Sequence, residues 1–489
     1  MRRLAIVLLG LGLLGCGEGE KDDGKRPNVL LITIDTLRAD RLGCYGFDRP
    51  TSPVLDGLAA RGTLFETARV PIARTTQSLA SLMTGLYPPL HGVRDLWGPN
   101  GVLPADRTTL AEVFGRQGYR TGGAWAVPFF DENAQGLAQG LGEFQRSWTD
   151  DVEAKVVTDA GLEFLGAKDG RPFFLWLHYR DPHMPYGPPP AENIAFGGEG
   201  YRGPFEKAFY YYPIPDRTVS LAALPPDRKE RKAKIVYGGG DLTPQDHRRA
   251  RDLYAGEVAA TDAEIGRLLE QLESGGLSKD TLIIVTADHG ESFGEHGYYY
   301  DHGEFTYDTC LRVPLLIAGP GVQEQRLAEP VRTVDVFSTV LEAAGAKEAE
   351  AVSGESLWGA LTGRRSLVGR PLFAETGQLL LSDRHDRRPV PGIAGRGVAL
   401  VTDRWKIVHT PGLEIDGGYE LYDLESDPSE QQSLASAPPD DCPWEALKKQ
   451  LAEWARAVHR EPKPGGQSAL DPDQIRRLEG VGYIMGGKK

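Results

Sequence analysis

Residues 29–34 have the sequence VLLITI, an uninterrupted apolar run rich in β-branched side chains. Such a run is typical of a strand that is buried on both faces of a parallel sheet. Similar runs occur at residues 173–177, 281–286 and 313–318, and helical or loop sequence separates each from the next. This alternation predicts an α/β fold, with a mostly parallel central sheet that helices cover on both faces.

Two segments outside these strands have helical periodicity. Apolar side chains recur every three or four positions in residues 253–272, which predicts an amphipathic helix. Residues 333–344 predict a second covering helix, ended by Gly345. By contrast, residues 185 to about 240 are rich in Pro, Gly and Tyr and have little periodicity. We interpret that stretch as a long irregular insertion near the mouth of the site, where it would influence substrate choice.

The pattern changes near residue 371. Short strands are indicated at residues 397–401, 405–409 and 419–422, and a helix from residue 443 to about residue 458. This predicts a small α+β subdomain packed on the first domain. The expected division is therefore a large domain over residues 27–370 and a C-terminal subdomain with its tail over residues 371–489.

The N-terminus resembles a lipoprotein signal. Arg2 and Arg3 precede an apolar run at residues 4–14, which is shorter than the about 20 residues of a membrane-spanning helix. Residues 13–16 (LLGC) resemble the bacterial lipobox, so we expect a signal peptide over residues 1–16, lipidation of Cys16 and a polar tether over residues 17–26. The expected location is extracytoplasmic, on a membrane of a bacterial cell envelope. The alternative is an ordinary signal peptide with an incidental cysteine.

Charge and cysteine content limit which molecules the protein is expected to bind and how its fold is stabilised. The formal net charge of -14 argues against nonspecific nucleic-acid binding, because an acidic surface is repelled by the phosphate backbone. The substrate can still be anionic, since a bound metal reverses the local field. With Cys16 lipidated, Cys44, Cys310 and Cys442 remain, and an odd number of thiols cannot pair completely within one chain. We therefore expect a fold that does not depend on disulfides.

Polar residues follow two of the predicted strands. Asp35 ends the first run, and Asp288, His289 and Gly290 follow the third. Ligands of parallel sheets lie outside the carboxyl ends of the strands, so these side chains should meet at one edge. Two carboxylates and an imidazole suit zinc, manganese or calcium, and Gly290 allows a close turn beneath the site. The alternative is a capped turn at Asp288 with His289 on the surface.

Three blocks occur in a fixed order. They are residues 28–46 (NVLLITIDTLRADRLGCYG), 75–92 (TTQSLASLMTGLYPPLHG) and 286–297 (TADHGESFGEHG). Over about residues 27–344 the chain resembles the sulfatase-like branch of the alkaline phosphatase superfamily, with weaker support from residues 420–428 (ELYDLESDP). The resemblance implies an alkaline-phosphatase-like α/β sandwich with a small C-terminal subdomain, and hydrolysis of sulfate or phosphate esters. It also implies one divalent ion, held by Asp35, Thr75, Asp288 and His289.

Thr75 stands at the nucleophile position of that family when the second block is aligned on Thr84 and Gly85. Family sulfatases have Cys or Ser there, which is oxidised to formylglycine, and threonine cannot undergo that conversion. The departure favours phosphorus chemistry, as in the similar phosphoethanolamine and phosphoglycerol transferases that use an unmodified threonine. A metal ion would lower the pKa of the hydroxyl, and a helix beginning at Thr75 would favour an anionic ester. The alternative role of Thr75 is a plain helix N-cap.

Two histidines match family positions near the ester. The resemblance implies oxyanion stabilisation or general-acid work for His183, and binding of an ester oxygen by an imidazolium at His302. Each could instead be a hydrogen-bonded surface histidine. Structural salt bridging is the expected role of Arg38, Asp40 and Asp262, and we find no second set of metal ligands.

The leading hypothesis is a lipoprotein hydrolase that cleaves a phosphate or sulfate ester through Thr75, with phosphate favoured. One alternative is a phosphoryl-group transferase that modifies envelope glycans or lipids. Another is a noncatalytic glycan-binding lipoprotein that retains the fold. The sequence leaves open whether the ester is carried by a sugar, a lipid or a polymer.

Overall fold

The computed structural model describes residues 26–95, 101–125, 134–146, 154–167, 169–211, 213–214, 228–346, 352–367, 369–376, 396–410 and 415–458. The predicted signal, Cys16, nearly all of the tether and the chain after residue 458 lie outside this part. No helix among the described residues is long and apolar enough to cross a membrane.

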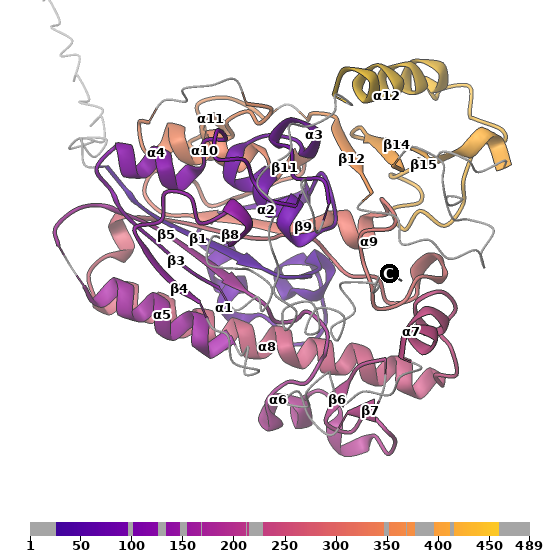
Figure 1. Cartoon of the computed structure of the whole chain (residues 1–489), viewed down its shortest axis with the longest axis horizontal. Helices are drawn as coiled ribbons and strands as arrows, with labels where there is room; N and C mark the ends of the chain where they lie inside the picture. Colours follow the sequence, from indigo (N-terminus) through magenta and orange to yellow (C-terminus); the bar gives the residue numbers. More distant parts are fainter. Residues whose placement is uncertain are drawn as a thin grey trace, which may run out of the picture.

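A nine-stranded sheet forms the centre of the large domain (Figure 1). The strands lie in the order β10-β2-β9-β8-β1-β5-β3-β4, and β11 pairs with β2. The block β8-β1-β5-β3-β4 is parallel, whereas β9 runs antiparallel to both β8 and β2. The strands are β1 (Asn28–Ile34), β2 (Thr63–Arg69), β3 (Arg120–Trp125), β4 (Glu143–Arg146), β5 (Phe173–Tyr179), β8 (Thr281–Ala287), β9 (Arg312–Ala318), β10 (Gln325–Leu327) and β11 (Val331–Arg332).

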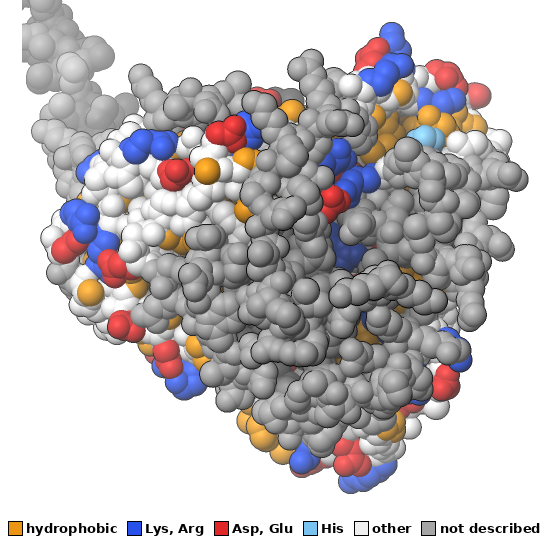
Figure 2. Space-filling view, in the orientation of Figure 1, with side chains coloured by type: hydrophobic (Ala, Val, Ile, Leu, Met, Phe, Trp, Pro, Cys, Tyr) orange, Lys and Arg blue, Asp and Glu red, His pale blue; other side chains and the backbone are white. Residues whose placement is uncertain are grey.

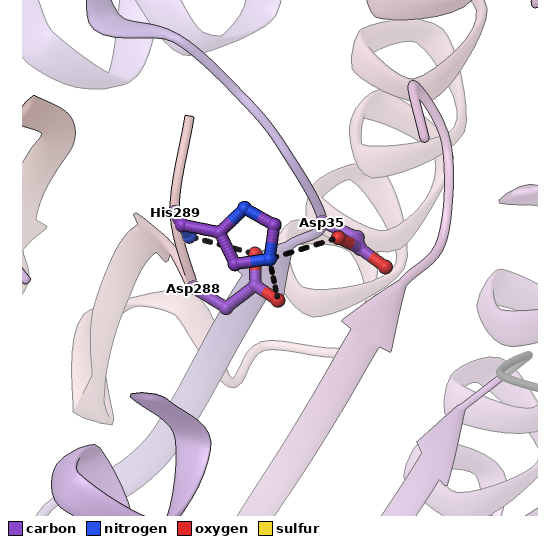
Figure 3. A group of neighbouring side chains, drawn as sticks. All are labelled: Asp35, Asp288 and His289. Atoms are coloured by element: carbon purple, nitrogen blue, oxygen red, sulfur yellow. Dashed lines mark hydrogen bonds and ion pairs between the residues drawn. The ribbon is translucent and has the colours of Figure 1, made fainter. Parts of the chain in front are cut away.

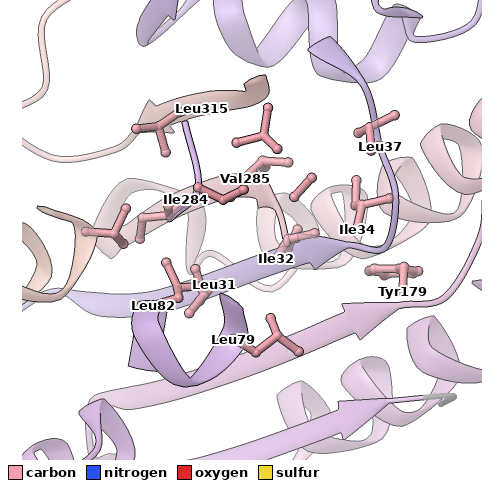
Figure 4. Close-up of a cluster of buried hydrophobic side chains, with 14 of the residues drawn as sticks. Leu31, Ile32, Ile34, Leu37, Leu79, Leu82, Tyr179, Ile284, Val285 and Leu315 are labelled. Atoms are coloured by element: carbon pink, nitrogen blue, oxygen red, sulfur yellow. The ribbon is translucent and has the colours of Figure 1, made fainter. Parts of the chain in front are cut away.

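The mostly parallel α/β fold that the apolar runs predicted is confirmed. All seven residues of β1 are buried, as are those of its parallel neighbours β5 and β8. Side chains on both faces of these strands contact helices, which is why their sequences lack the alternation of a half-exposed strand. Figure 4 shows Leu79 and Leu82 of α2 packed beside Leu31 of β1.

Helices cover the sheet on two sides (Figure 1). One face carries α1 (Pro53–Ala60), α5 (Ala154–Gly166) and α8 (Pro244–Ser274); the other carries α2 (Thr75–Thr84), α4 (Leu110–Arg116) and α10 (Asp335–Ala343). The short helices are α3 (Pro88–His91), α9 (Asp308–Leu311) and α11 (Trp358–Leu361).

Two of these helices compare closely with the sequence predictions. The helix α8 contains the predicted residues 253–272 but begins earlier, because Thr243 and Asp246 form a capping box at its N-terminus. The helix α10 agrees with the prediction for residues 333–344, and Gly345 beyond it has a φ of 65°.

The insertion after β5 is less irregular than predicted. Its described part contains α6 (Pro190–Ala195), β6 (Ala208–Phe209), β7 (Pro213–Ile214) and α7 (Arg228–Val236). All four elements are short, so none has a periodic segment long enough to be identified from the sequence alone.

A second, four-stranded antiparallel sheet follows, in the order β12-β13-β14-β15, with α12 packed on one side. It confirms the predicted small C-terminal subdomain, although β12 was not foreseen. Its elements are β12 (Leu372–Glu375), β13 (Val398–Val401), β14 (Trp405–His409), β15 (Tyr419–Asp423) and α12 (Trp444–Val458). Its own core consists of Val398, Leu400, Trp405, Ile407, Leu421, Cys442, Leu447 and Leu451.

Charged side chains join the second sheet to the first. Lys406 of β14 is fully buried and reaches Asp308 at the start of α9, at 3.0 Å, and also Glu430. Arg69 at the end of β2 contacts the same Asp308 carboxylate at 2.6 Å. Figure 2 shows further basic side chains on one face beside the second sheet. Arg94 pairs with Glu375 of β12.

Candidate active site

Asp35 and Asp288 lie at the carboxyl ends of β1 and β8, which are adjacent parallel strands with Ile34 opposite Ala287. The Nε2 atom of His289 is 3.8 Å from Asp35 Oδ1 and 3.4 Å from Asp288 Oδ2 (Figure 3). All three side chains are buried, and their candidate ligand atoms lie within 4.8 Å of one another. The predicted cluster at this sheet edge is therefore present.

Three carboxylate oxygens of this cluster make no hydrogen bond within the described part of the chain. Neither oxygen of Asp35, nor Oδ2 of Asp288, has a hydrogen-bond partner among the described residues. Asp288 Oδ1 instead accepts from the backbone N–H of Thr36 at 3.2 Å and of His289 at 2.8 Å. The Nδ1 atom of His289 lies 2.9 Å from the carbonyl oxygen of Gly290, so Nδ1–H donates there and Nε2 keeps its lone pair. This donor set fits a divalent cation.

The electrostatics of the cluster lead to the same conclusion. Burial, and then the neighbouring Asp288 carboxylate, raise the pKa of Asp35 well above its ordinary value. Burial raises the pKa of Asp288 to about 7 and lowers that of His289. Two buried carboxylates side by side are costly as anions unless a cation accompanies them. The residues are therefore suited to hold a metal ion.

Gly290 allows the close turn that the sequence predicted. Its N–H donates to the carbonyl oxygen of Cys310 at 2.8 Å, and a Cβ atom at this position would collide with the carbonyl oxygen of Thr309. The backbone beneath the ligands therefore has no room for a side chain.

Thr75 is the first residue of α2, and its Oγ1 is 3.4 Å from Nε2 of His289. Burial raises the pKa of Asp288, and the nearby Thr75 side chain is among the groups that oppose this rise. The N-cap position belongs to Arg74, so the hydroxyl of Thr75 is directed toward the ligands instead of capping the helix. The structure brings Thr75 to the three predicted ligands.

His183 and His302 lie beside this cluster. Their rings are 5.4 Å apart, and the ring of His302 is 4.1 Å from that of His289. His302 Nδ1 contacts Glu291 Oε1 at 3.1 Å, and His183 Nδ1 donates to the carbonyl oxygen of Met184 at 2.6 Å. Burial followed by the charge of Arg74 lowers the pKa of His302 to about 3. Burial thus favours the neutral ring of His302, whereas the sequence resemblance predicted an imidazolium.

Some residues of the site were missed by the sequence analysis. A pocket beside the ligands is lined by His183 and His302 and also by Arg74, Lys232 and Glu291. Glu291 directly follows the Asp-His-Gly block and Arg74 directly precedes Thr75, so both positions carried a signal. Lys232 lies in the insertion on α7, where no motif marks it. Tyr210, Tyr211, Tyr300, Asp301 and Met184 complete the lining.

Thr36 was also missed. It follows Asp35 with a φ of 56°, a left-handed conformation that is costly for a β-branched residue. Its N–H binds Asp288, and its carbonyl oxygen accepts from the hydroxyl of Tyr254 at 2.8 Å. Both contacts hold the backbone in the conformation that places Asp35 and Asp288 side by side.

The predicted salt bridging holds for Arg38 but not for Asp262. Arg38 contacts Asp40 and Glu295, each at 2.8 Å. Asp262 on α8 instead accepts from the backbone N–H groups of Val54 and Leu55, both at 2.9 Å, and so caps the N-terminus of α1. Burial raises its pKa to about 6.

Comparison with known proteins gives two family matches. The family model described as Sulfatase matches residues 27–346, and the model described as N-sulphoglucosamine sulphohydrolase, C-terminal, matches residues 294–457. An ulvan-active sulfatase of Formosa agariphila is 26% identical over 73% of this chain and 70% of its own length. Arylsulfatase K of Gallus gallus is 27% identical over 84% of this chain and 79% of its own.

Solved structures share the fold. A protein in complex with its substrate D-glucosamine-2-N,6-O-disulfate has a TM-score of 0.70 at 20% identity, covering 90% of this chain and 99% of that one. The phosphonate monoester hydrolase of Agrobacterium radiobacter has a TM-score of 0.66 at 24% identity, covering 88% of this chain and 95% of its own. Enzymes named for sulfur and for phosphorus substrates thus share this architecture.

Proposed function

Because the chain belongs to the sulfatase family, a family of sulfuric ester hydrolases, we propose that it is a metal-dependent ester hydrolase in which Thr75 is the nucleophile and phosphate esters are the preferred substrates. The observation that carries the proposal is the position of the Thr75 hydroxyl, at the first residue of α2 and 3.4 Å from Nε2 of His289. No other hydroxyl-bearing side chain of the described residues is hydrogen-bonded to these ligands.

The chemistry of threonine supports a phosphate ester, and not a sulfate ester, as the substrate. A formylglycine hydrate carries two hydroxyls on one carbon, so its sulfate ester can be released by breaking the carbon–oxygen bond. A threonine ester has no second hydroxyl, and only attack on its central atom can release it. Phosphorus is open to such in-line attack, as phosphoryl transfer in general shows. The likeness to a protein named phosphonate monoester hydrolase also supports this choice.

The proposed reaction has two steps. Thr75 Oγ1 bonds to phosphorus as the bond to the ester oxygen breaks, and the departing alkoxide takes up a proton. Water then attacks the same phosphorus, the Thr75 oxygen–phosphorus bond breaks, and Thr75 regains its proton. A divalent ion held by Asp35, Asp288 and His289 would lower the pKa of the Thr75 hydroxyl and offset the charge of the ester.

We propose that His183, which lines the pocket beside the ligands, moves those protons. Because its Nδ1–H donates to the Met184 carbonyl oxygen, Nε2 of the neutral ring carries a lone pair. We propose that this atom accepts the proton of Thr75 and returns it to the leaving oxygen, then repeats the exchange between water and Thr75. Glu291, through its contact with Nδ1, keeps the ring of His302 turned toward the pocket.

The experiment that tests the proposal is a parallel screen with zinc, manganese and calcium. Purified protein is assayed with p-nitrophenyl phosphate, methyl p-nitrophenyl phosphate and p-nitrophenyl sulfate. Turnover of a phosphate ester above that of the sulfate supports the proposal, and faster turnover of the sulfate contradicts it. Added acceptor alcohols distinguish hydrolysis from transfer, because a transferase would form phosphorylated alcohol in place of free phosphate.

We further propose that Cys16 anchors the enzyme to a bacterial envelope membrane, which rests on the lipobox-like sequence LLGC. Glycan sulfates are the substrates named for relatives such as the ulvan-active sulfatase, so we propose a glycan or lipid carrier for the phosphate ester. Metabolic labelling with palmitate should mark the wild-type chain and leave Cys16→Ser unlabelled. Equal labelling of both chains would contradict the anchor.

Metal binding should stabilise the folded protein. We expect one equivalent of divalent ion to bind and to raise the free energy of unfolding, by about 2.7 kcal/mol at a hundredfold excess over Kd. Asp35→Ala should abolish this gain, because it removes one of the buried carboxylate ligands. Asp159→Asn, a change at a half-exposed carboxylate on α5, is the matched control. Calorimetry and metal analysis give the stoichiometry, and equal stabilisation of all three chains would contradict the site.

A further inference from the structure

Arg74 is a buried cation next to the nucleophile. It occupies the N-cap position of α2, directly before Thr75, and only 8% of its surface is exposed. It lines the same pocket as His183 and His302. After burial, its positive charge is the next cause that lowers the pKa of His302, and it acts with Lys232 and His302 to lower the pKa of Asp301. An ester bound at Thr75 would therefore meet this side chain.

Gly303 keeps the place of that guanidinium open. Its φ is +92°, and a Cβ atom built there would collide with the Nε, Cζ and Cδ atoms of Arg74. Glycine is suited to this position because it tolerates a left-handed backbone and leaves space for the side chain of Arg74. Because Gly303 follows His302, the same turn places the histidine and supports the guanidinium.

The other cation of the pocket has a different setting. Lys232 of α7 contacts Asp301 Oδ2 at 3.0 Å and lies over the ring of Tyr211 at 5.0 Å. Its ammonium is therefore held by Asp301 and by the insertion, whereas Arg74 is itself the residue that directly precedes Thr75. A guanidinium also offers a planar fork of N–H donors that matches two phosphate oxygens, which an ammonium does not.

We infer that Arg74 binds the non-bridging oxygens of the ester and makes the enzyme selective for dianionic phosphate monoesters over singly charged phosphate diesters and sulfate esters. This inference rests on the proposed function of Thr75. A monoester places a second negative charge on the oxygens that face the guanidinium, while a diester replaces one of those oxygens with an uncharged alkoxy group. The attraction in a buried site is larger than in water, so the difference in charge becomes a difference in rate.

The test compares p-nitrophenyl phosphate with methyl p-nitrophenyl phosphate in the metal-loaded enzyme. Arg74→Gln should lower kcat/KM for the monoester by about 10²- to 10³-fold and that for the diester by about tenfold or less. Arg74→Lys keeps the charge without the fork and should give an intermediate loss. Arg326→Gln, which changes a half-exposed arginine on β10, should leave both rates unchanged.

A second variant keeps the test sharp. Gly303→Ala leaves the charge of Arg74 in the chain but displaces its guanidinium, and it should reduce the preference for the monoester in the same direction. Binding of inorganic phosphate to Arg74→Gln, measured by calorimetry together with its metal content, shows whether the folded site remains. Retained metal with weakened phosphate binding supports the inference.

Two outcomes separate this inference from the proposal beneath it. If Arg74→Gln lowers the monoester and diester rates by equal factors, the selectivity role is wrong while Thr75 can still be the nucleophile. If Thr75→Ala keeps full activity, the proposed function fails whatever Arg74 does.

Discussion

Replacing Thr75 with alanine should reduce turnover of phosphate esters by about 10⁴-fold or more, because the proposed reaction has no other nucleophile. Thr75→Ser should recover part of the activity, since its hydroxyl can occupy the same position near His289. Rapid quenching of the wild-type reaction should reveal a phosphate adduct on the peptide that contains Thr75, by mass spectrometry. The adduct should be missing from Thr75→Ala.

The control for this result is metal content. Thr75→Ala keeps Asp35, Asp288 and His289, so it should still take up a divalent ion. A variant that binds metal and has lost turnover identifies Thr75 as the reacting group. Full turnover by metal-loaded Thr75→Ala would overturn the assignment.

The second large effect is expected on stability. Lys406→Met should lower the free energy of unfolding by about 3–5 kcal/mol, because it leaves the buried carboxylates of Asp308 and Glu430 with too little positive charge. Urea unfolding followed by circular dichroism measures the change. Lys449→Met, at a side chain on α12 that is 75% exposed, should change stability by less than about 1 kcal/mol. A similar small loss for Lys406→Met would contradict the role of the buried cluster.

The same cluster predicts that the free energy of unfolding depends on pH in two ways, one through Asp308 and one through Glu430. Arg69 and Lys406 hold the pKa of Asp308 below its ordinary value although burial opposes them, so its contribution is present above about pH 4 and is lost as pH falls further. Burial, and the carboxylate of Asp308, raise the pKa of Glu430 to about 7 despite the opposing charge of Lys406. Glu430 therefore lowers stability as pH rises from about 4 toward 7. Chemical unfolding at several pH values should show the loss of stability at low pH and the loss as pH rises toward 7. Glu430→Gln should remove the loss toward pH 7.

The strands that place the site could be predicted because their sequences have few alternatives. The run at residues 29–34 is apolar at every position, and parallel pairing with β5 and β8 buries all of it. The direction of β9 could not be predicted, since its apolar run at residues 313–318 suits either direction. The strand β2 (TLFETAR) escaped notice because Thr, Glu and Arg interrupt its apolar pattern.

Some residues of the site could likewise be predicted from the sequence, and others could not. The end-of-strand positions of Asp35 and Asp288 follow from the topology of parallel sheets, so they could be predicted from position alone. Thr75 was assigned only through the family resemblance, since a threonine at a helix start is ordinarily a cap. Lys232 could not be assigned, because a lysine on a charged helix has no distinguishing pattern. The partnership of Lys406 with Asp308 joins positions 98 residues apart, which no local pattern reveals.

The loop that carries His302 is held by the second sheet as well as by the first. The ring of Tyr307 stacks on His296 at 3.6 Å, and its hydroxyl donates to Glu420 of β15 at 3.0 Å. A chimera joined near residue 371 would pair the loop of one parent with the second sheet of another, and a chain shortened there would lose the contact between Tyr307 and Glu420. The C-terminal subdomain is thus not a detachable module, and an engineer who wishes to exchange it must transfer residues 296–308 with it.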